Sequence, residues 1–317
     1  MKPSKPRIVS IGGGTGLSTL LRGLKKCRAD LSAIVTVTDD GGSSGRLREE
    51  LGALPPGDIR NCMIALSEDE HLMSRLFRFR FNSEGGLHDH SFGNLFLTAM
   101  AGVTGDFAEA VHLASEVLAI KGVIYPLTNS NVSLSAELED GTVVNGETRI
   151  TASRQRIRRV NLNPSDARPL PNALKAIESA DVITIGPGSL YTSLIPNMLV
   201  KEVIGAIRAS NATKIYIQNI MTQPGETAGY SAADHVKALA DHCNGVLFPD
   251  ILLNDRAPSA SILKKYDAEH AGLVKTDLER LRALQLNIVE RDLLAEDGVV
   301  RHDPDRLARA VFEMGGL

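Results

Sequence analysis

A glycine-rich segment near the N-terminus has the composition of a phosphate-binding loop. It consists of Gly12, Gly13, Gly14, Thr15 and Gly16, and it follows a short apolar run. Glycines let backbone N–H groups come close to a phosphate, and a helix that begins there attracts its negative charge. Leu17 stands where the dinucleotide fingerprint has a further glycine, and no Gly-Lys-Ser/Thr sequence follows. The segment therefore predicts a phosphate site that is neither a dinucleotide-binding loop nor a P-loop. The alternative is a tight strand-to-helix turn without a ligand.

A second segment combines acids, glycines, serines and an arginine: Asp39, Asp40, Gly41, Gly42, Ser43, Ser44, Gly45 and Arg46. Doubly wound proteins place an acid that binds ribose hydroxyls at the end of the second strand, where Asp39 and Asp40 fall. One of these carboxylates is also suited to a divalent cation, since Mg²⁺ prefers carboxylate oxygens. Arg46 and Arg48 add positive charge suited to phosphate. The alternative is a mobile surface loop whose acids and arginines pair with each other.

Polar residues also follow two later strands. Gly188 and Ser189 close one of them, and Asn219 ends the next. With the two glycine-rich segments they make four polar loops at the carboxyl ends of strands, which should converge on one crevice that accepts an elongated ligand. Three further candidates are Asp58, Asn61 and Asn94. The first and last of these fit helix N-caps equally well.

Other patterns argue against other kinds of protein. The run His88-Asp89-His90 needs a further ligand from elsewhere, so we predict a mobile loop and no zinc. The basic cluster at 154–159 is typical of the solvent side of a strand. With 4% aromatic residues and a net charge of −3, we expect no nucleic-acid partner. No Gly-x-Ser-x-Gly elbow supports a nucleophile-centred hydrolase. Three widely spaced cysteines and no signal peptide predict a cytoplasmic protein, and no apolar run is long enough to predict a membrane span.

Alternating strand and helix patterns must position these residues. They predict an α/β fold with a Rossmann-like, doubly wound and mainly parallel sheet. We expect one domain over residues 1–317, with a small antiparallel hairpin insertion at about 123–162, where the hydrophobic period changes to two. The predicted strands are 7–11, 31–37, 182–185, 214–219 and 246–249. The predicted helices include 17–26, one from 58 or 59, 94–104, 107–118, one opened by a capping box at Ser231 and Asp234, and 306–314.

The segments 36–48 and 55–61 closely resemble the gluconeogenesis factor family, the YvcK-like relatives of the CofD-type phospholactate transferases. The resemblance extends to 93–95, 186–193, 221–227 and 298–304. It implies a Rossmann-like cytosolic protein needed for cell shape and for growth on gluconeogenic carbon sources. It also implies binding of UDP-sugars such as UDP-N-acetylglucosamine without established catalysis. The matching positions around the nucleotide or sugar are Thr15, Asp40, Asn94, Ser189, Asn219, Tyr266 and Arg301.

Three hypotheses follow. The leading one is a UDP-sugar-binding regulator that acts through a protein partner, and a homo-oligomer is compatible with it. The second is a Mg²⁺-dependent transferase of the phospholactate class, whose metal the resemblance assigns to aspartates; Asp39, Asp40 and Asp58 are the positions suited to that here, Asp40 and Asp58 above all. The third, an NAD-linked oxidoreductase, rests on the fold alone, and Leu17 argues against it. No cofactor besides Mg²⁺ is expected.

Overall fold

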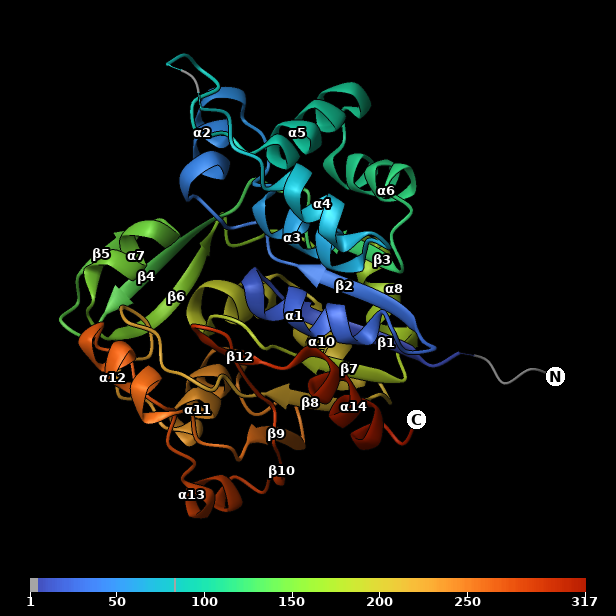
Figure 1. Ribbon diagram of the computed structural model, residues 1–317. Helices are drawn as coiled ribbons and strands as arrows, with labels where there is room; N and C mark the ends of the chain where they lie inside the picture. Colours follow the sequence, from blue (N-terminus) through green and yellow to red (C-terminus); the bar gives the residue numbers. More distant parts are fainter. Residues whose placement is uncertain (1–4, 83) are drawn as a thin grey trace.

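The computed structural model describes residues 5–82 and 84–317, and in this part of the chain seven parallel strands form the main sheet (Figure 1). Their order is β10-β9-β8-β7-β1-β2-β3. The strands are β1 (Arg7–Gly12), β2 (Asp30–Val35), β3 (Val123–Pro126), β7 (Val182–Ile185), β8 (Thr213–Ile217), β9 (Asp250–Asn254) and β10 (Asn287–Arg291). The strand order reverses at β1, between β2 and β7, which makes the carboxyl ends of these strands the natural ligand crevice. The doubly wound α/β prediction is confirmed.

Helices cover both faces of this sheet, so its strands are apolar on both sides. On one face, α1 (Gly14–Leu24) packs against α3 (Gly57–Leu66) and α14 (Pro304–Met314). Figure 1 shows α8 (Pro171–Ser179) and α10 (Val203–Ala209) behind the strands, as right-handed crossovers require. The apolar stripe of α1 predicted from the sequence is buried: Leu17, Leu20, Leu21 and Leu24.

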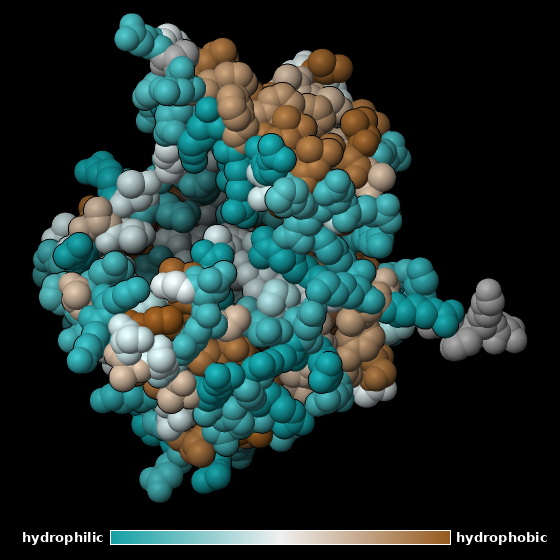
Figure 2. All heavy atoms as spheres, in the orientation of Figure 1, coloured by the Kyte–Doolittle hydropathy of each residue, from teal (hydrophilic) through white to brown (hydrophobic). Residues whose placement is uncertain are grey.

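The remaining helices surround this core. They are α2 (Gly42–Leu51), α4 (Glu70–Phe77), α5 (Phe92–Thr104), α6 (Phe107–Val117), a π-helix (Leu190–Leu194), α9 (Ile195–Leu199), α11 (Ala232–Cys243), α12 (Ala260–Ala268) and α13 (Leu278–Ala283). The predicted capping box of α11 is present, with Ser231 and Asp234 bonding each other's backbone N–H. Hydrophobic residues gather on the surface over α5 and α6, on the side away from the crevice (Figure 2). No helix in the described residues is long and apolar enough to cross a membrane.

A small antiparallel sheet lies beside the carboxyl ends of the main strands, with the order β5-β4-β6. It is formed by β4 (Ser133–Leu138), β5 (Val143–Asn145) and β6 (Ile157–Asn163), with α7 (Glu147–Ser153) between the last two. The predicted boundary of this insertion was wrong at its start. Val123–Pro126 pairs in parallel with β2 and is an edge strand of the main sheet. A four-residue apolar run fits either sheet, and only its pairing partner distinguishes the two.

Two further predictions needed correction. The strand placed at 246–249 begins only at Asp250, because Pro249 lacks the backbone N–H that a ladder in the sheet needs. Phe248 instead stacks on the buried Tyr216. The second glycine-rich segment is not a free loop: from Gly42 onward it is the first turn of α2. A two-stranded sheet, β11 (Leu294–Glu296) with β12 (Val300–His302), completes the fold before α14.

Candidate functional site

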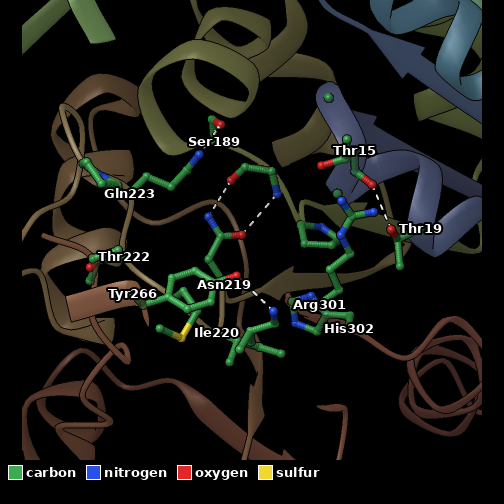
Figure 3. A pocket seen from close by; sticks show the side chains of 18 of the residues that line it. Thr15, Thr19, Ser189, Asn219, Ile220, Thr222, Gln223, Tyr266, Arg301 and His302 are labelled. Carbon is green, nitrogen blue, oxygen red and sulfur yellow. Dashed lines mark hydrogen bonds between the residues drawn. The ribbon is translucent and has the colours of Figure 1, made fainter. Parts of the chain in front are cut away.

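A pocket of about 280 Å³ lies at the carboxyl ends of β1, β7 and β8 (Figure 3). We call it the first pocket. It is formed by the first turn of α1, the loops after β7 and β8, α12 and β12. Nine of the residues singled out from the sequence line it: Gly13, Gly14, Thr15, Gly16, Gly188, Ser189, Asn219, Tyr266 and Arg301. The fold therefore brings together residues from five separate segments of the chain.

The first turn of α1 is built to face an anion. The N-cap Gly13 supplies no side-chain hydrogen bond, and the N–H of Gly14 donates to the Asp58 carboxylate, which leaves the N–H groups of Thr15 and Gly16 for a ligand. Gly14 has a φ of 64°, which favours glycine. At Gly16 a Cβ atom would lie 2.5 Å from the carbonyl oxygen of Pro187. Glycine there lets the loop after β7 approach the helix, and the two together close one side of the first pocket.

Asn219 stabilises another part of the wall of the first pocket, the loop after β7. Its Nδ2 donates to the carbonyl oxygen of Gly188 at 2.7 Å, and its Oδ1 accepts from the N–H of Gly188 at 3.3 Å (Figure 3). Next to it, Gln223 Nε2 donates to Ser189 Oγ at 2.8 Å. These bonds tie the loop after β8 to the loop after β7. Asn219 thus shapes the first pocket through the backbone of Gly188.

The C-terminal segment adds the one guanidinium among the residues that line the first pocket. Arg301 has no ion-pair partner within the described residues, which leaves this guanidinium free for a phosphate. The hydroxyl of Tyr266 accepts a hydrogen bond from the N–H of Val300 at 2.9 Å, which fixes the ring at the pocket wall. Burial lowers the pKa of His302 to about 4, so its imidazole is neutral at physiological pH.

A second, smaller cavity of about 200 Å³ lies beyond Gly13, and we call it the polar compartment. It is lined by Asp39, Gly41, Gly42, Ser43, Ser44, Gly57, Asp58, Arg60, Asn61, Arg80 and Asn94. Figure 2 shows this face of the molecule hollowed between the antiparallel sheet and helices α2 and α3. Eight of the sequence-derived candidates are in this second set, among them Asp58, Asn61 and Asn94. The candidates therefore divide between two neighbouring cavities.

Hydrogen bonds hold the walls of the polar compartment. Arg60 donates to both Asn94 Oδ1 and Ser91 Oγ at 2.8 Å, and Asn94 Nδ2 donates to Ser44 Oγ at 3.3 Å. The N-cap of α5 is Ser91, so the N-cap interpretation of Asn94 was wrong. The N-cap interpretation of Asp58 was wrong too, because Pro56 has that position in α3.

His90 also belongs to this wall. Its Nδ1 lies 3.0 Å from Ser43 Oγ, and both side chains are buried. Burial, followed by the charge of Arg46, lowers the pKa of His90. The run 88–90 was predicted to be a mobile loop; its last residue instead packs into the fold and positions the hydroxyl of Ser43.

Two carboxyl groups in this region, those of Asp58 and Glu147, have raised pKa values. Burial and the nearby charge of Asp39 raise the pKa of Asp58 to about 6, although the N–H of Gly14 donates to this carboxylate. Burial and the charges of Asp39, Asp58 and Glu226 raise the pKa of Glu147 to about 9. Glu147 is therefore protonated at neutral pH and can donate a hydrogen bond. Sequence reasoning missed Glu147, because nothing in the residues around it on α7 indicates that the fold places it near Asp39 and Asp58.

Asp40 does not point into either cavity. Its Oδ1 accepts from the backbone N–H of Thr148 at 2.9 Å and from Thr148 Oγ1 at 2.7 Å. It therefore caps the start of α7. Asp39 is the carboxyl that shares the polar compartment with Asp58, so this pair, and not Asp40 with Asp58, is suited to a Mg²⁺ ion. The described residues contain no group of three or more His, Cys, Asp or Glu side chains arranged around a metal position.

Two more candidates lie outside both cavities. Gly12 ends β1, and a Cβ atom there would lie 3.4 Å from Leu194 of the π-helix. Arg46 lies on α2 with its Nη2 buried and without a hydrogen-bond partner in the described part of the chain. The sequence singled out both residues because they belong to the glycine-rich segments, but neither lines the first pocket or the polar compartment.

Comparisons with known proteins agree with the family resemblance. Residues 8–294 match the family model described as 2-phospho-L-lactate transferase CofD. The gluconeogenesis factor of Bacillus subtilis is 49% identical over 311 residues, covering 98% of both chains. The gluconeogenesis factor of Halalkalibacterium halodurans is 48% identical over 310 residues, covering 98% of this chain and 96% of the relative.

A solved structure gives the same result. A crystal structure of a Bacillus halodurans protein superposes with a TM-score of 0.95 at 47% identity, covering 98% of this chain and all of the other. Since the family model spans most of the chain and the relatives match nearly end to end, this protein belongs to the CofD family and, within it, groups with the gluconeogenesis factors.

Proposed function

We propose that this protein is a cytoplasmic regulator that binds a UDP-sugar of the UDP-N-acetylglucosamine type. The observation that carries the proposal is the first pocket, where Thr15 and Gly16 in the first turn of α1 line the same space as Arg301, which has no ion-pair partner within the described residues. Backbone N–H groups at a helix N-terminus and a free guanidinium are two groups well suited to hold a diphosphate. The ligand is therefore an anion with its phosphates beside Thr15 and Gly16.

The rest of the pocket suits a nucleoside. Ile220, Met221 and Val300 supply apolar surface, and Tyr266 is fixed beside them by its hydrogen bond to Val300. Asn219 and the backbone of Gly188 offer amide groups for a ring or a ribose. A mostly apolar wall with a few positioned polar groups is typical of small-ligand sites. The family relationship, and not the geometry, is what favours uridine among the nucleosides.

The regulatory role rests on the relatives, which are named gluconeogenesis factors. We propose that ligand occupancy is passed to a protein partner and that the outcome is normal cell shape and growth on gluconeogenic carbon sources. A strain that lacks the protein should grow poorly on such carbon sources and recover when the wild-type chain is supplied. If the strain grows normally without the protein, the regulatory part of the proposal fails.

Isothermal titration calorimetry tests the binding directly. UDP-N-acetylglucosamine should bind the wild-type chain at sub-millimolar concentration, and Arg301→Ala should weaken binding at least tenfold because the phosphate loses its cationic partner. Arg309→Ala, an arginine on the exposed side of α14, is the matched control and should bind like the wild type. The proposal is wrong if neither UDP-N-acetylglucosamine nor UDP-glucose binds.

A second function is favoured by one observation. Asp39 and Asp58 share the polar compartment next to the phosphate position, as a Mg²⁺-dependent phospholactate-type transferase would need. That function predicts transfer to a deazaflavin acceptor that requires Mg²⁺ and is lost in Asp58→Asn. Product formation by the wild type would establish it, and a lack of product with Mg²⁺ and deazaflavin acceptors present would argue for the regulator.

A further inference from the structure

The proposed function places the phosphates and the nucleoside in the first pocket and leaves the polar compartment without an assigned role. We propose that it is the subsite for the sugar ring of the nucleotide-sugar, and that Asn61, Arg60 and Ser43 recognise the sugar hydroxyls. This inference rests on the proposed function, because it places the part of the ligand that lies beyond the diphosphate.

The position of the compartment fits this assignment. Gly13 lines the first pocket, and a Cβ atom on Gly13 would lie 2.5 Å from Asp58 Oδ2, which lines the compartment. The N–H of the next residue, Gly14, donates to the Asp58 carboxylate. Gly13, which lines the first pocket, thus lies directly against Asp58, which lines the compartment. A group attached to a phosphate at the start of α1 has only to pass Gly13 to reach the compartment.

Three glycines create the space. Besides Gly13, a Cβ on Gly57 would lie 2.6 Å from Asp39 Oδ2 and 2.8 Å from Ser44 Oγ. A Cβ on Gly93 would lie 2.6 Å from the Cδ1 of Phe77 and 2.9 Å from the Cδ of Arg60. Gly13 and Gly57 therefore let carboxylates approach where a Cβ atom would collide with them, and Gly93 makes room for the side chains of Phe77 and Arg60. Three independent segments of the chain contribute one such glycine each, which indicates a built cavity and not a packing gap.

The chemistry of the wall selects a neutral, hydroxyl-rich group. Two carboxylates, Asp39 and Asp58, line the compartment with two guanidiniums, Arg60 and Arg80, and Arg80 is already ion-paired with Asp89, so no excess of positive charge is left for an anion. A further phosphate would meet the two carboxylates at close range and be repelled. A nucleobase would find little apolar wall, since the lining is made of glycines and charged, amide and hydroxyl side chains. Sugar hydroxyls can both donate to the carboxylates and accept from the guanidiniums.

One donor of a residue in this wall lacks a protein partner in the described residues. Arg60 uses its terminal nitrogens for Ser91, Asn94 and Asn61, but its Nε is buried and has no hydrogen-bond partner in the described residues. A buried donor without a partner costs free energy, which a ligand hydroxyl would recover. Ser43 is held by His90, and Asn61 by Arg60 Nη2 at 3.3 Å. The polar groups are therefore oriented before a ligand arrives.

The test compares two ligands that differ only in the sugar. Calorimetry with UDP and with UDP-N-acetylglucosamine would be run on the wild type, Asn61→Ala, Ser43→Ala and Arg301→Ala. Asn129→Ala is the matched control, since Asn129 also makes one side-chain hydrogen bond, to Asp106, and lines neither cavity. Melting temperatures, measured for every variant, show which of them are folded.

Asn61→Ala and Ser43→Ala should each lower the affinity for UDP-N-acetylglucosamine about tenfold and change that for UDP less than about twofold. Arg301→Ala should lower both affinities by the same factor, and Asn129→Ala neither. The sugar subsite is overturned if both compartment variants, being folded, bind UDP-N-acetylglucosamine like the wild type or lose affinity for UDP equally. Failure of the wild type to bind UDP-N-acetylglucosamine at all would instead overturn the proposed function and the subsite with it.

Discussion

The carboxylate of Asp40 accepts two hydrogen bonds from Thr148, one from its backbone N–H and one from its hydroxyl, although the two residues are 108 positions apart. These bonds join the segment after β2 to the first turn of α7. The antiparallel sheet is thereby attached to the main sheet next to the polar compartment. Asp40 acts on the site by holding α7 in place.

This contact predicts the effect of changing Asp40. Asp40→Ala should lower the free energy of unfolding by about 1–3 kcal/mol, because two donors at the start of α7 lose their acceptor. Asp40→Asn should cost less, since its side-chain oxygen can still accept. Urea denaturation of both variants measures this. If Asp40→Ala unfolds at the same urea concentration as the wild type, the contact does not stabilise the fold.

Asn219 is expected to act on ligand affinity through Gly188. Asn219→Ala removes both hydrogen bonds that hold the loop after β7, so UDP should bind about tenfold more weakly. Asn219→Asp should be worse, because its charged oxygens face the carbonyl oxygen of Gly188. Titration with UDP measures both variants. If the wild type and Asn219→Ala bind UDP with equal affinity, the hydrogen bonds between Asn219 and Gly188 are not needed for binding.

Two helical glycines offer a matched pair. In Gly16→Ala the new methyl group would lie 2.5 Å from the Pro187 oxygen, so we expect a loss of about 1–3 kcal/mol of stability together with weaker UDP binding. Around Gly102 on α5, apart from the adjoining backbone of its own helix, no atom of the described residues lies within 4 Å of the place where a Cβ would stand. Gly102→Ala should therefore raise stability by up to about 1 kcal/mol.

Thermal and urea unfolding of the two glycine variants, with UDP titrations alongside, check the pair. The close approach of α1 to the loop after β7 is contradicted if Gly16→Ala behaves like Gly102→Ala in both measurements.

Asp58 should make stability depend on pH. Its pKa is raised to about 6 from an ordinary value of 3.8, so the folded protein binds this proton more tightly than the unfolded chain. The resulting stabilisation is complete below about pH 4 and is lost as the pH rises through about 6. A rise of about two pKa units corresponds to about 3 kcal/mol at most.

Asp58→Asn cannot ionise and avoids this loss. The variant should therefore gain stability relative to the wild type between about pH 4 and about pH 7.5, measured by urea denaturation across that range. A constant difference between the two proteins over the range would contradict the raised pKa.

Much of the fold was predictable from the sequence because its signals are local. The leucines of α1 recur at helical spacing, and the strands 7–11 and 182–185 are short apolar runs that end at glycines. The corresponding elements are β1, α1 and β7. The start of the antiparallel insertion was not predictable, because Val123–Pro126 has no local feature that selects its partner β2.

Most residues that line the two cavities could be predicted from the sequence, but their arrangement in space could not. Glycine at 13 and 57 could be recognised as unusual, but the reason, close contact with Asp58 and Asp39, is a tertiary one. The same holds for the division into two cavities and for Glu147, whose raised pKa comes from burial and from carboxyls distant in the sequence. The hydrogen bonds of Asp40 to Thr148 could not be inferred from a motif in which Asp40 is adjacent to Asp39.

The most direct test of the central claim is a crystal structure of the protein with UDP-N-acetylglucosamine bound. The diphosphate should lie within hydrogen-bond distance of the backbone N–H groups of Thr15 and Gly16, with Arg301 in contact and the nucleoside beside Asn219 and Tyr266. Density for the ligand at another surface, or a first pocket that stays empty at saturating ligand, would contradict the account.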